Sequence, residues 1–561
     1  MQENPDNFYR ILNNITGILV KLGVSHAVLC PGSRSAPLAL SILRNGNIKS
    51  FIINDERSAG YIALGIAQQT RKTVALVSTS GTAAVNFAPA VAEAFFQEIP
   101  LLVLTADRPV ETIGQNENQA IFQKNLYSPN VLKSFQFNIL YNDYESEQAA
   151  YRIVSEAINT SLYPQMGPVH INVPLREPLY LVQKFKFMDE GKKIIELVNI
   201  EHTIQSETQK QLVKELSSFN KIMIVAGLYP PARKLERNLN KFLSFTDVVF
   251  IPDIISNLNG IERSIKHQEV IIKKMTDQQI DELKPDLLIT FGGQIVSNIF
   301  KSYIRGVAPK DHWHIDFSGR TIDSFSTLTK ILPIDPEYFF KLLLKNIGYF
   351  KTKTYQGYFK KWESLDIQAK QQIINSLSDI NKAELFYVGK IVSHLPKNSM
   401  VQLGNSLPVR YFNNLRNTDN PHYKTITFFS NRGTSGIDGS LSTAVGSALT
   451  TGRVVTLVSG DLSFFYDRNG LWNNYIPPNL KVIVLNNHGG QIFGKIPGCK
   501  DQPELNDYFI THQLLNIKET VNQHKLNYLY CNHPDQVAKC LSDLYSLNDK
   551  TTVLEFDILP A

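Results

Sequence analysis

Cysteine and uninterrupted apolar sequence are both scarce in this chain of 561 residues. Its four cysteines, Cys30, Cys499, Cys531 and Cys540, have neither the spacing of a metal site nor that of a disulfide framework. No apolar run approaches the roughly 20 residues that a transmembrane helix needs. The opening residues, MQENPDNFYRIL, lack the charged-then-apolar pattern of a signal peptide. We therefore expect a protein of the reducing cytoplasm with no membrane partner.

Charge of one sign is not concentrated anywhere along the chain. The formal net charge is +6, from 57 Lys and Arg against 51 Asp and Glu, and the basic residues are scattered. A nucleic-acid surface needs basic residues in clusters, so we expect no nucleic-acid partner, and the mild excess suits small anionic substrates. The composition, 43% hydrophobic and 19% charged, is typical of a globular protein. The length predicts three to four domains.

Residues 454–490 contain two apolar strands around which the chain is organised. Residues 454–458 predict a buried parallel strand, followed by the tight turn Ser459-Gly460-Asp461. A helix and the breaker pair Pro477-Pro478 separate it from a second strand, 482–485, which ends in Asn487. If the strands are neighbours, Asp461 and Asn487 lie together at their carboxyl ends, where open α/β sheets bind ligands.

The oxygen atoms in these two turns are suited to a hard divalent cation. Asp461, Asn487 and the backbone carbonyl of Gly489 would supply three ligands to Mg²⁺, or to Mn²⁺, and a bound diphosphate would supply more. Gly460 and Gly490 would let the backbone approach a phosphate closely. The alternative is a pair of ordinary turns, in which Asp and Asn are common.

Strands and helices alternate along the first part of the chain. The patterns predict helices at 8–22, 59–67 and 83–96 and strands at 26–30, 51–53, 74–77 and 101–104. This alternation predicts a parallel sheet with right-handed crossovers.

An internal repeat links the two ends of the chain. Residues 63–67 and 74–78 resemble 444–448 and 455–459 at the same offset of 381 residues. Asp461 then aligns with Ser80, and Asn487 with Ala106, so only the C-terminal copy has the metal ligands. Glu56 aligns with Ile437, so only the N-terminal copy has that carboxylate. Chance similarity of two strand-helix patterns is the weaker interpretation, because the offset is constant.

The middle of the chain predicts a third α/β unit. Its strands end in glycine turns at 226–227 and 291–293, and neither turn is a full GxGxxG motif, so a dinucleotide site is only weakly indicated. Residues 180–200 and 345–380 are interpreted as connections. The predicted fold is α/β, with three doubly wound parallel-sheet domains at 1–180, 195–345 and 375–561.

This arrangement, with Glu56 in the first unit and the GD…NN pair in the third, resembles the thiamine diphosphate enzymes of the decarboxylase and acetolactate synthase type. The resemblance implies a homodimer or homotetramer with thiamine diphosphate bound between subunits. The first domain would bind the pyrimidine ring, and the third would bind the diphosphate and the metal. Glu56 would hydrogen-bond the pyrimidine ring nitrogen as a protonated carboxyl, which requires an apolar site that raises its pKa. Ile437 would be the apolar wedge that bends the cofactor.

Five short motifs narrow the resemblance. They are CPGSRSAPL at 30–38, ADRP at 106–109, NQAI at 118–121, NRGTSGIDG at 431–439 and NHGGQIF at 487–493. Together they resemble the 2-succinyl-5-enolpyruvyl-6-hydroxy-3-cyclohexene-1-carboxylate synthases of menaquinone biosynthesis. These enzymes decarboxylate 2-oxoglutarate and add the succinyl semialdehyde carbanion to isochorismate.

The resemblance also implies which residues form the site. The implied catalytic residues are Glu56, Ser33 and Gln119. The implied substrate-binding residues are Ser33, Arg34, Arg108, Asn118, Gln119, Ser406, Arg410, Arg432 and Phe493. The implied cofactor-binding residues are Glu56, Ser406, Ile437, Gly460, Asp461, Asn487, Gln491 and Ile492, and the implied metal ligands are Asp461, Asn487 and Gly489. Both substrates carry two carboxylates, so bidentate arginine forks are the expected partners.

One position departs from the family pattern. The family commonly has a lysine in the loop after the middle unit's Gly-Gly strand, where this chain has Asn298 and Ile299. Lys301 is the candidate to replace it. Three other functions stay open: another thiamine diphosphate-dependent 2-oxoacid decarboxylase or carboligase, a catalytically silent cofactor-binding protein, and a basic nucleic-acid binder.

Overall fold

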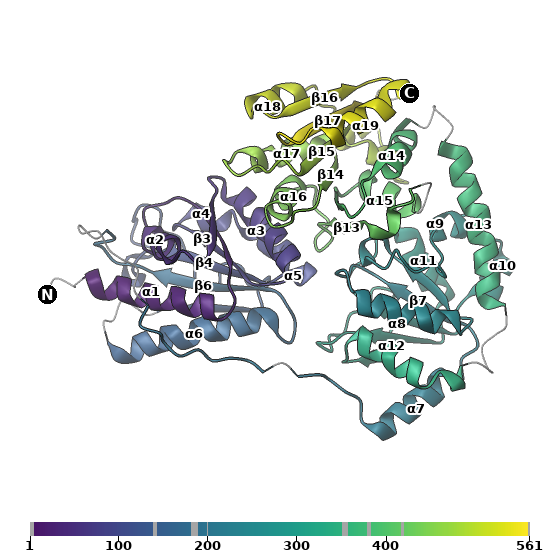
Figure 1. Cartoon of the computed structure of the whole chain (residues 1–561), viewed down its shortest axis with the longest axis horizontal. Coiled ribbons are helices and arrows are strands. Elements are labelled where there is room, and N and C mark those ends of the chain that lie inside the picture. The colour runs from purple at the N-terminus through teal and green to yellow at the C-terminus, as the bar shows by residue number, and fades with distance from the viewer. Residues whose placement is uncertain are drawn as a thin grey trace.

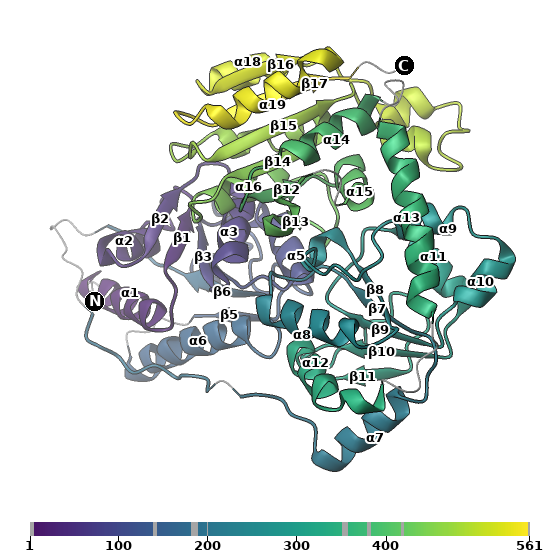
Figure 2. The same cartoon turned by 45° about the vertical axis from the view of Figure 1, so that its right-hand side comes forward.

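The computed structural model describes residues 5–137, 143–180, 189–198, 200–350, 357–377, 383–416 and 420–558. Within them, three parallel sheets follow one another along the chain, and each has helices on both faces (Figures 1 and 2). The prediction of three doubly wound parallel sheets is therefore confirmed. Each sheet falls within one predicted domain range, while the domain boundaries themselves stay a prediction.

The first sheet has the strand order β2-β1-β3-β4-β6-β5. Its strands are β1 (His26–Leu29), β2 (Lys49–Ile52), β3 (Val74–Ser78), β4 (Leu101–Asp107), β5 (Lys133–Gln136) and β6 (Pro168–Pro174). Its helices are α1 (Pro5–Lys21), α2 (Ala36–Asn45), α3 (Glu56–Thr70), α4 (Thr82–Val85), α5 (Ala88–Gln97) and α6 (Tyr144–Leu162). Apolar side chains of α1, α2 and α6 cover one face, and those of α3 and α5 cover the other.

The middle sheet has the order β11-β10-β9-β7-β8. Its strands are β7 (Ile222–Ala226), β8 (Val249–Pro252), β9 (Leu287–Phe291), β10 (Asp311–Ile315) and β11 (Lys330–Leu332). Its helices are α7 (Ser206–Leu216), α8 (Arg233–Ser244), α9 (Gln268–Ile272), α10 (Asp277–Leu283), α11 (Asn298–Val307), α12 (Pro336–Lys345) and α13 (Tyr358–Leu377). Helices α7, α8 and α12 pack on one face, and α9, α10, α11 and α13 contribute to the core on the other.

The third sheet has the order β13-β12-β14-β15-β17-β16. Its strands are β12 (Met400–Leu403), β13 (Thr427–Ser430), β14 (Val455–Gly460), β15 (Leu480–Asn486), β16 (Asn527–Cys531) and β17 (Thr552–Asp557). Its helices are α14 (Ala383–His394), α15 (Leu407–Asn414), α16 (Ser440–Ala448), α17 (Asp461–Tyr466), α18 (Ile517–Gln523) and α19 (Val537–Ser546). Counted from the first strand of each sheet, this order is the same as that of the first sheet, which supports the internal repeat.

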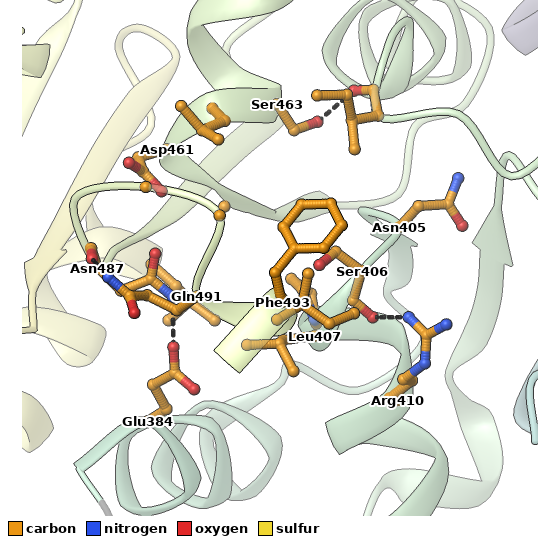
Figure 3. A pocket seen from close by; sticks show the side chains of 18 of the residues that line it. Glu384, Asn405, Ser406, Leu407, Arg410, Asp461, Ser463, Asn487, Gln491 and Phe493 are labelled. Carbon is orange, nitrogen blue, oxygen red and sulfur yellow. Dashed lines mark hydrogen bonds between the residues drawn. The ribbon is translucent and has the colours of Figure 1, made fainter. Parts of the chain in front are cut away.

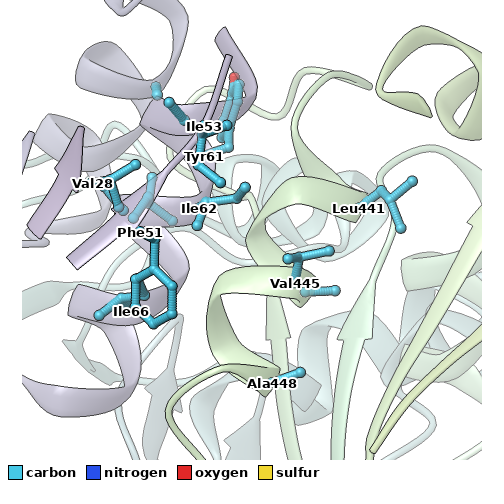
Figure 4. Packing of buried hydrophobic residues seen from close by; sticks show 14 of the residues in the cluster. Val28, Phe51, Ile53, Tyr61, Ile62, Ile66, Leu441, Val445 and Ala448 are labelled. Atoms are coloured by element: carbon cyan, nitrogen blue, oxygen red, sulfur yellow. The ribbon is translucent and has the colours of Figure 1, made fainter. Parts of the chain in front are cut away.

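Helices α3 and α16, which are equivalent in the repeat, pack against each other at the centre of the molecule (Figure 4). A Cβ on Gly65 would lie 2.2 Å from the Thr443 carbonyl oxygen, and one on Gly446 would lie 2.1 Å from the Ile62 carbonyl oxygen. The two contacts are copies of each other, because 65 aligns with 446 and 62 with 443. This close approach joins the first and third sheets through one continuous core.

Two predicted segments differ from the structure. The helix predicted at 83–96 is two helices, α4 and α5, because Pro89 cannot donate a backbone hydrogen bond and fits only the first turn of a helix. Residues 345–380 were interpreted as a connection, which is wrong for residues 358–377. These form α13, whose buried residues Tyr358, Trp362, Ala369 and Ile373 have helical spacing among many charged ones. Among the residues described, no helix combines the length and apolarity needed to cross a membrane.

Candidate active site

A cavity of about 340 Å³ opens at the carboxyl ends of the third sheet (Figure 3). Every site residue that the sequence predicted beyond position 400 lines it: Ser406, Arg410, Arg432, Ile437, Gly460, Asp461, Asn487, Gly489, Gln491, Ile492 and Phe493. Its size is within the range of small-molecule and cofactor sites. The structure thus brings together side chains from four separate stretches of sequence.

The strand register places the two turns of the cavity next to each other. Strand β14 pairs in parallel with β15, with Gly460 opposite Leu485, so Asp461 and Asn487 leave neighbouring strands at the same edge. Gly489 has a φ of +146°, and a Cβ there would lie 2.8 Å from the Ile510 carbonyl oxygen. Glycine is therefore required at 489, because a side chain would push the turn away from the segment that covers it.

Asp461 is a buried carboxylate that forms no ion pair with the described residues. It is 1% exposed, and burial raises its pKa, while a hydrogen bond from the Gln513 side chain at 3.0 Å lowers it. Among the described residues, no lysine, arginine or histidine forms an ion pair with Asp461. A bound cation would supply the missing charge, since a buried carboxylate is costly unless it is paired.

The donor set around Asp461 fits Mg²⁺ better than a softer metal. In the described part of the chain, no cluster of three His, Cys, Asp or Glu side chains could hold a metal. The available ligands are one carboxylate, the amide of Asn487 and the carbonyl of Gly489, all hard oxygens. Mg²⁺ commonly takes one or two protein carboxylates and completes its shell with phosphate and water. The residues present therefore fit a metal that is bound together with a diphosphate.

Two arginines line the cavity without a carboxylate partner. Arg432 is 6% exposed, and its Nε is buried without a hydrogen-bond partner. Arg410 donates from Nη1 to the Ser406 carbonyl oxygen at 2.6 Å. Burial lowers the pKa of both guanidinium groups, and the charge of Arg410 further lowers the pKa of Arg432. Within the described ranges, neither forms an ion pair, so the cavity has positive charge available for an anionic ligand.

The loop that carries Arg432 is held by hydrogen bonds to residues from all three α/β units. Glu93 of α5 accepts hydrogen bonds from the backbone N–H groups of Gly433 and Thr434, each at 2.7 Å. Gln294, after β9, donates to the Gly433 carbonyl oxygen at 2.7 Å. Asn405, after β12, donates to the Asn431 carbonyl oxygen at 2.6 Å. The position of Arg432 is therefore fixed by the packing of the whole chain.

Lys301 lies near Arg432 but does not line the cavity. It is in the second turn of α11, which begins at Asn298. Burial lowers the pKa of Lys301, and the charge of Arg432 lowers it further, which requires the two cations to be close. This proximity supports Lys301 as the replacement for the lysine that the family commonly has at the position of Asn298.

The predicted site residues of the first sheet lie elsewhere. They are Ser33, Arg34, Glu56, Arg108, Asn118 and Gln119, and none of them is among the described residues that line the cavity. Ser33 and Arg34 follow β1, Glu56 follows β2, and Arg108 follows β4. Burial lowers the pKa of Arg34, and the charge of Arg108 lowers it further, so these two cations are neighbours. Within one chain the predicted residues therefore form two groups.

Three of these first-sheet side chains have partners in the chain. Arg34 donates to the Leu175 carbonyl oxygen at 2.9 Å and to Glu177 at 3.2 Å. Ser33 Oγ and the Tyr180 hydroxyl are 2.9 Å apart. Arg108 Nε donates to the Asn118 carbonyl oxygen at 3.0 Å, which links the ADRP and NQAI motifs.

Glu56 begins α3 at the junction of the first and third units. Asp55 caps this helix by accepting from the N–H groups of Arg57 and Ser58, and its other oxygen accepts from Asn469 at 2.7 Å. Burial raises the pKa of Glu56, and the Asp55 carboxylate raises it further, while a backbone hydrogen bond lowers it. The direction is the one that a proton-holding carboxyl requires.

A second cavity, of about 450 Å³, lies at the carboxyl ends of the middle sheet. It is lined by the predicted glycine turns, Gly227 and Gly292-Gly293, and by none of the predicted site residues. Its cation, Arg320, is paired with Glu98 and Asp316. Of the two cavities, the first is therefore the one that unites oxygen donors suited to Mg²⁺ with arginines that form no ion pair among the described residues.

Several residues of the cavity and its rim were not predicted from the sequence. Glu384 and Tyr411 line it, Lys495 bonds to both, and Gln513 bonds to Asp461. Glu384 follows the segment interpreted as a connection, and Gln513 follows the π-helix Leu505–Ile510. No local pattern marks any of them, because their proximity to the site comes from the tertiary fold.

Comparison with known proteins agrees with this geometry. Residues 11–126 match the family model described as "Thiamine pyrophosphate enzyme, N-terminal TPP binding domain". A 2-succinyl-5-enolpyruvyl-6-hydroxy-3-cyclohexene-1-carboxylate synthase of Cytophaga hutchinsonii is 37% identical over 553 residues, covering 97% of this chain and 95% of the relative. The synthase of Flavobacterium johnsoniae is also 37% identical with the same coverage, and that of Porphyromonas gingivalis is 34% identical over 95% of this chain and 92% of the relative. On these matches the chain belongs to the 2-succinyl-5-enolpyruvyl-6-hydroxy-3-cyclohexene-1-carboxylate synthase family of thiamine diphosphate enzymes.

Proposed function

We propose that the cavity of the third sheet, completed by Glu56 and the other first-sheet residues, is the active site of this synthase. The reaction is decarboxylation of 2-oxoglutarate and transfer of the remaining four-carbon unit to isochorismate. The products are CO₂ and 2-succinyl-5-enolpyruvyl-6-hydroxy-3-cyclohexene-1-carboxylate, an intermediate of menaquinone biosynthesis. Family membership supports the reaction, and the cavity supports the assignment of residues.

The observation that carries the substrate class is the pair Arg410 and Arg432. Both line the cavity, both are desolvated, and neither has a carboxylate partner among the described residues. Each substrate brings two carboxylates, and a guanidinium fork binds a carboxylate through two parallel hydrogen bonds. An apolar or cationic substrate would form no ion pair with these guanidinium groups.

The Asp461 end of the cavity is proposed to hold Mg²⁺ or Mn²⁺ with the cofactor diphosphate. Asp461, Asn487 and the Gly489 carbonyl would bind the metal, and Gly460 leaves open space beside it, since a Cβ there would meet nothing within 4 Å. Ser406, Gln491 and Ile492 would contact the cofactor, and the 38%-exposed side chain of Ile437 would support its bent form. Thiamine diphosphate, when bound, would supply a cationic thiazolium ring that stabilises negative charge at the reacting carbon.

The first-sheet residues are proposed to complete the reacting end. Glu56 would hold a proton against the cofactor's ring nitrogen, which its raised pKa supports. Ser33 and Gln119 would hydrogen-bond substrate hydroxyl and carbonyl groups, next to Asn118. Arg34 and Arg108 would bind a second carboxylate, and Phe493 would supply an apolar wall of the cavity.

We infer that these residues come from a second copy of the chain. In one chain, Glu56 does not line the cavity that contains Asp461. Phe122, three residues after Gln119, is 78% exposed and would lie near the second copy in such an assembly. A homodimer, or a tetramer built from such dimers, would bring the two groups together.

A direct assay tests the function. Purified protein with thiamine diphosphate, Mg²⁺, 2-oxoglutarate and isochorismate should deplete the isochorismate absorbance and release CO₂ in equal amounts. Pyruvate, which lacks the distal carboxylate, should be a poor donor. Equal use of pyruvate, or CO₂ release that does not depend on isochorismate, would instead favour a sister decarboxylase or carboligase.

Replacing either unpaired arginine should impair substrate use and spare the cofactor. A charge-assisted hydrogen bond contributes roughly 1.5–3 kcal/mol, about 10–150-fold. We therefore expect Arg410→Ala and Arg432→Ala each to lower kcat/KM for 2-oxoglutarate or isochorismate by at least about 10-fold. Arg432→Lys should restore only part, because lysine keeps the charge and loses the fork.

The control for these variants is Arg233→Ala, at an exposed arginine of α8 that does not line the cavity. Its kinetics should equal those of the wild type, and thiamine diphosphate affinity should be unchanged in all four variants. Full activity in both Arg410→Ala and Arg432→Ala would remove the arginines from the proposed site.

A further inference from the structure

Glu384 is a carboxylate of the cavity to which the reaction assigns no role. It is the second residue of α14, its side chain is 14% exposed, and it lines the cavity on the side of Asn487 (Figure 3). Its two oxygens have different partners. Oε1 accepts from Asn487 Nδ2, and Oε2 accepts from the Tyr411 hydroxyl and from Lys495 Nζ.

The bond to Asn487 fixes the orientation of an amide. A carboxylate only accepts hydrogen bonds, so Glu384 requires the NH₂ group of Asn487 on its own side. The Asn487 oxygen is then directed away from Glu384. A metal needs this oxygen, because the amide nitrogen is not a ligand for a hard cation. Without Glu384, the oxygen and nitrogen of this amide would be free to exchange places.

The second oxygen of Glu384 connects two further elements of the site. Tyr411 follows Arg410 on α15, and Lys495 ends the 3₁₀-helix Gln491–Lys495, which carries Ile492 and Phe493. Lys495 also donates to the Tyr411 hydroxyl at 2.6 Å. Burial raises the pKa of Tyr411, and the Glu384 charge raises it further, so this hydroxyl stays protonated and donates. One carboxylate thus contacts the metal ligand, the arginine-bearing helix and the cofactor-lining turn.

We propose that Glu384 is a positioning residue that orients the Asn487 amide oxygen toward the metal. It also holds Asn487 in place relative to α15 and the Gln491–Lys495 turn. This inference rests on the proposed function, because it assumes that Asn487 is a metal ligand. It adds a residue that touches neither metal nor substrate and acts through Asn487. Partners of metal ligands typically change metal affinity by about 10–100-fold when they are removed.

The amide chemistry allows a test by exchange of polarity. In Glu384→Gln, the new amide has one oxygen and one NH₂ group, so it cannot accept on both sides. It keeps the Tyr411 and Lys495 bonds only if it donates to Asn487, which turns the Asn487 oxygen away from the metal. In the double variant Glu384→Gln/Asn487→Asp, the glutamine NH₂ donates to a carboxylate, which presents an oxygen to the metal in either orientation. Net charge is conserved in the double variant.

The quantity to measure, by calorimetry, is the Mg²⁺ concentration that gives half-maximal thiamine diphosphate binding. We expect Glu384→Gln to raise this Mg²⁺ concentration about 10–100-fold. The double variant should bring it most of the way back to the wild-type value. The control Glu519→Gln, at an exposed glutamate in the first turn of α18 that does not line the cavity, should stay within about twofold of the wild type. Thermal unfolding without cofactor should show that Glu384→Gln is folded.

An unchanged Mg²⁺ requirement in Glu384→Gln would overturn the inference, and so would a double variant that binds no better than Glu384→Gln. The proposed function fails in a different way. If the wild-type protein itself binds thiamine diphosphate without any dependence on Mg²⁺, the metal site is wrong and the role of Glu384 falls with it. If the wild type shows the dependence and Glu384→Gln matches it, only the role of Glu384 is wrong.

Discussion

Replacing Glu56 by Gln is expected to lower kcat by roughly 10²–10⁴-fold, the usual cost of losing a positioned proton-transfer group. The glutamine is isosteric, so it should fit at the start of α3 and leave the Asp55 cap intact. It cannot hold or release a proton at that position. Much of the thiamine diphosphate affinity should remain, because the diphosphate and the metal are bound by residues of the third sheet.

The direct measurement for this variant is deuterium exchange at C2 of the bound cofactor, which reports activation independently of turnover. Exchange should be slowed in Glu56→Gln. The matched control is Glu145→Gln, an exposed glutamate in the first turn of α6, which should exchange and turn over like the wild type. Exchange at the wild-type rate in Glu56→Gln would assign proton transfer to another group.

Replacing Asp461 by Ala should weaken thiamine diphosphate binding by more than about 100-fold, since losing only a partner of a metal ligand typically costs about 10–100-fold in metal affinity. Asp461 is the one carboxylate of the metal-binding donor set, and without the metal the diphosphate charge is left unneutralised. The substitution also removes a buried carboxylate that forms no ion pair among the described residues, so the fold should survive.

Calorimetry with thiamine diphosphate and Mg²⁺ measures this effect, and thermal unfolding of the metal-free protein checks the fold. Asp501→Ala is the control, because Asp501 is exposed and outside the cavity. The control should bind with wild-type affinity. Unchanged affinity in a folded Asp461→Ala protein would mean that the GD…NN pair is an ordinary pair of turns.

The proximity of Asp461 and Asn487 could be predicted from sequence because its determinants are local. Residues 454–458 and 482–485 are mostly apolar, as buried parallel strands require. Each strand is followed within a few residues by a turn that contains the polar residue. Only the pairing of the two strands was an inference, and the β14–β15 register confirms it. The internal repeat supported the same prediction, because it aligned Asp461 and Asn487 with residues that are not candidate metal ligands.

The supporting residues could not be predicted in this way. Glu384 and Asn487 are 103 positions apart, and Glu93 and Gly433 are 340 apart. Neither pair has a periodic or motif signal, because each depends on how the three sheets pack. Helix α13 was not predicted for a related reason. Its few buried residues are separated by many charged ones on a long exposed face, so the apolar pattern is weak.

The roles assigned to the first-sheet residues stay predictions, and one measurement tests them together with the cavity. The central claim is that Glu56 of one subunit and Asp461 of another form a single site. Glu56→Gln and Asp461→Ala proteins, each inactive alone, can be mixed in equal amounts under conditions that exchange subunits. Each heterodimer would then have one site with both wild-type residues, so random pairing should restore about one quarter of the wild-type activity. A mixture that contains verified heterodimers and stays inactive would place Glu56 and Asp461 in a site within one chain, or in no common site, and would contradict the account.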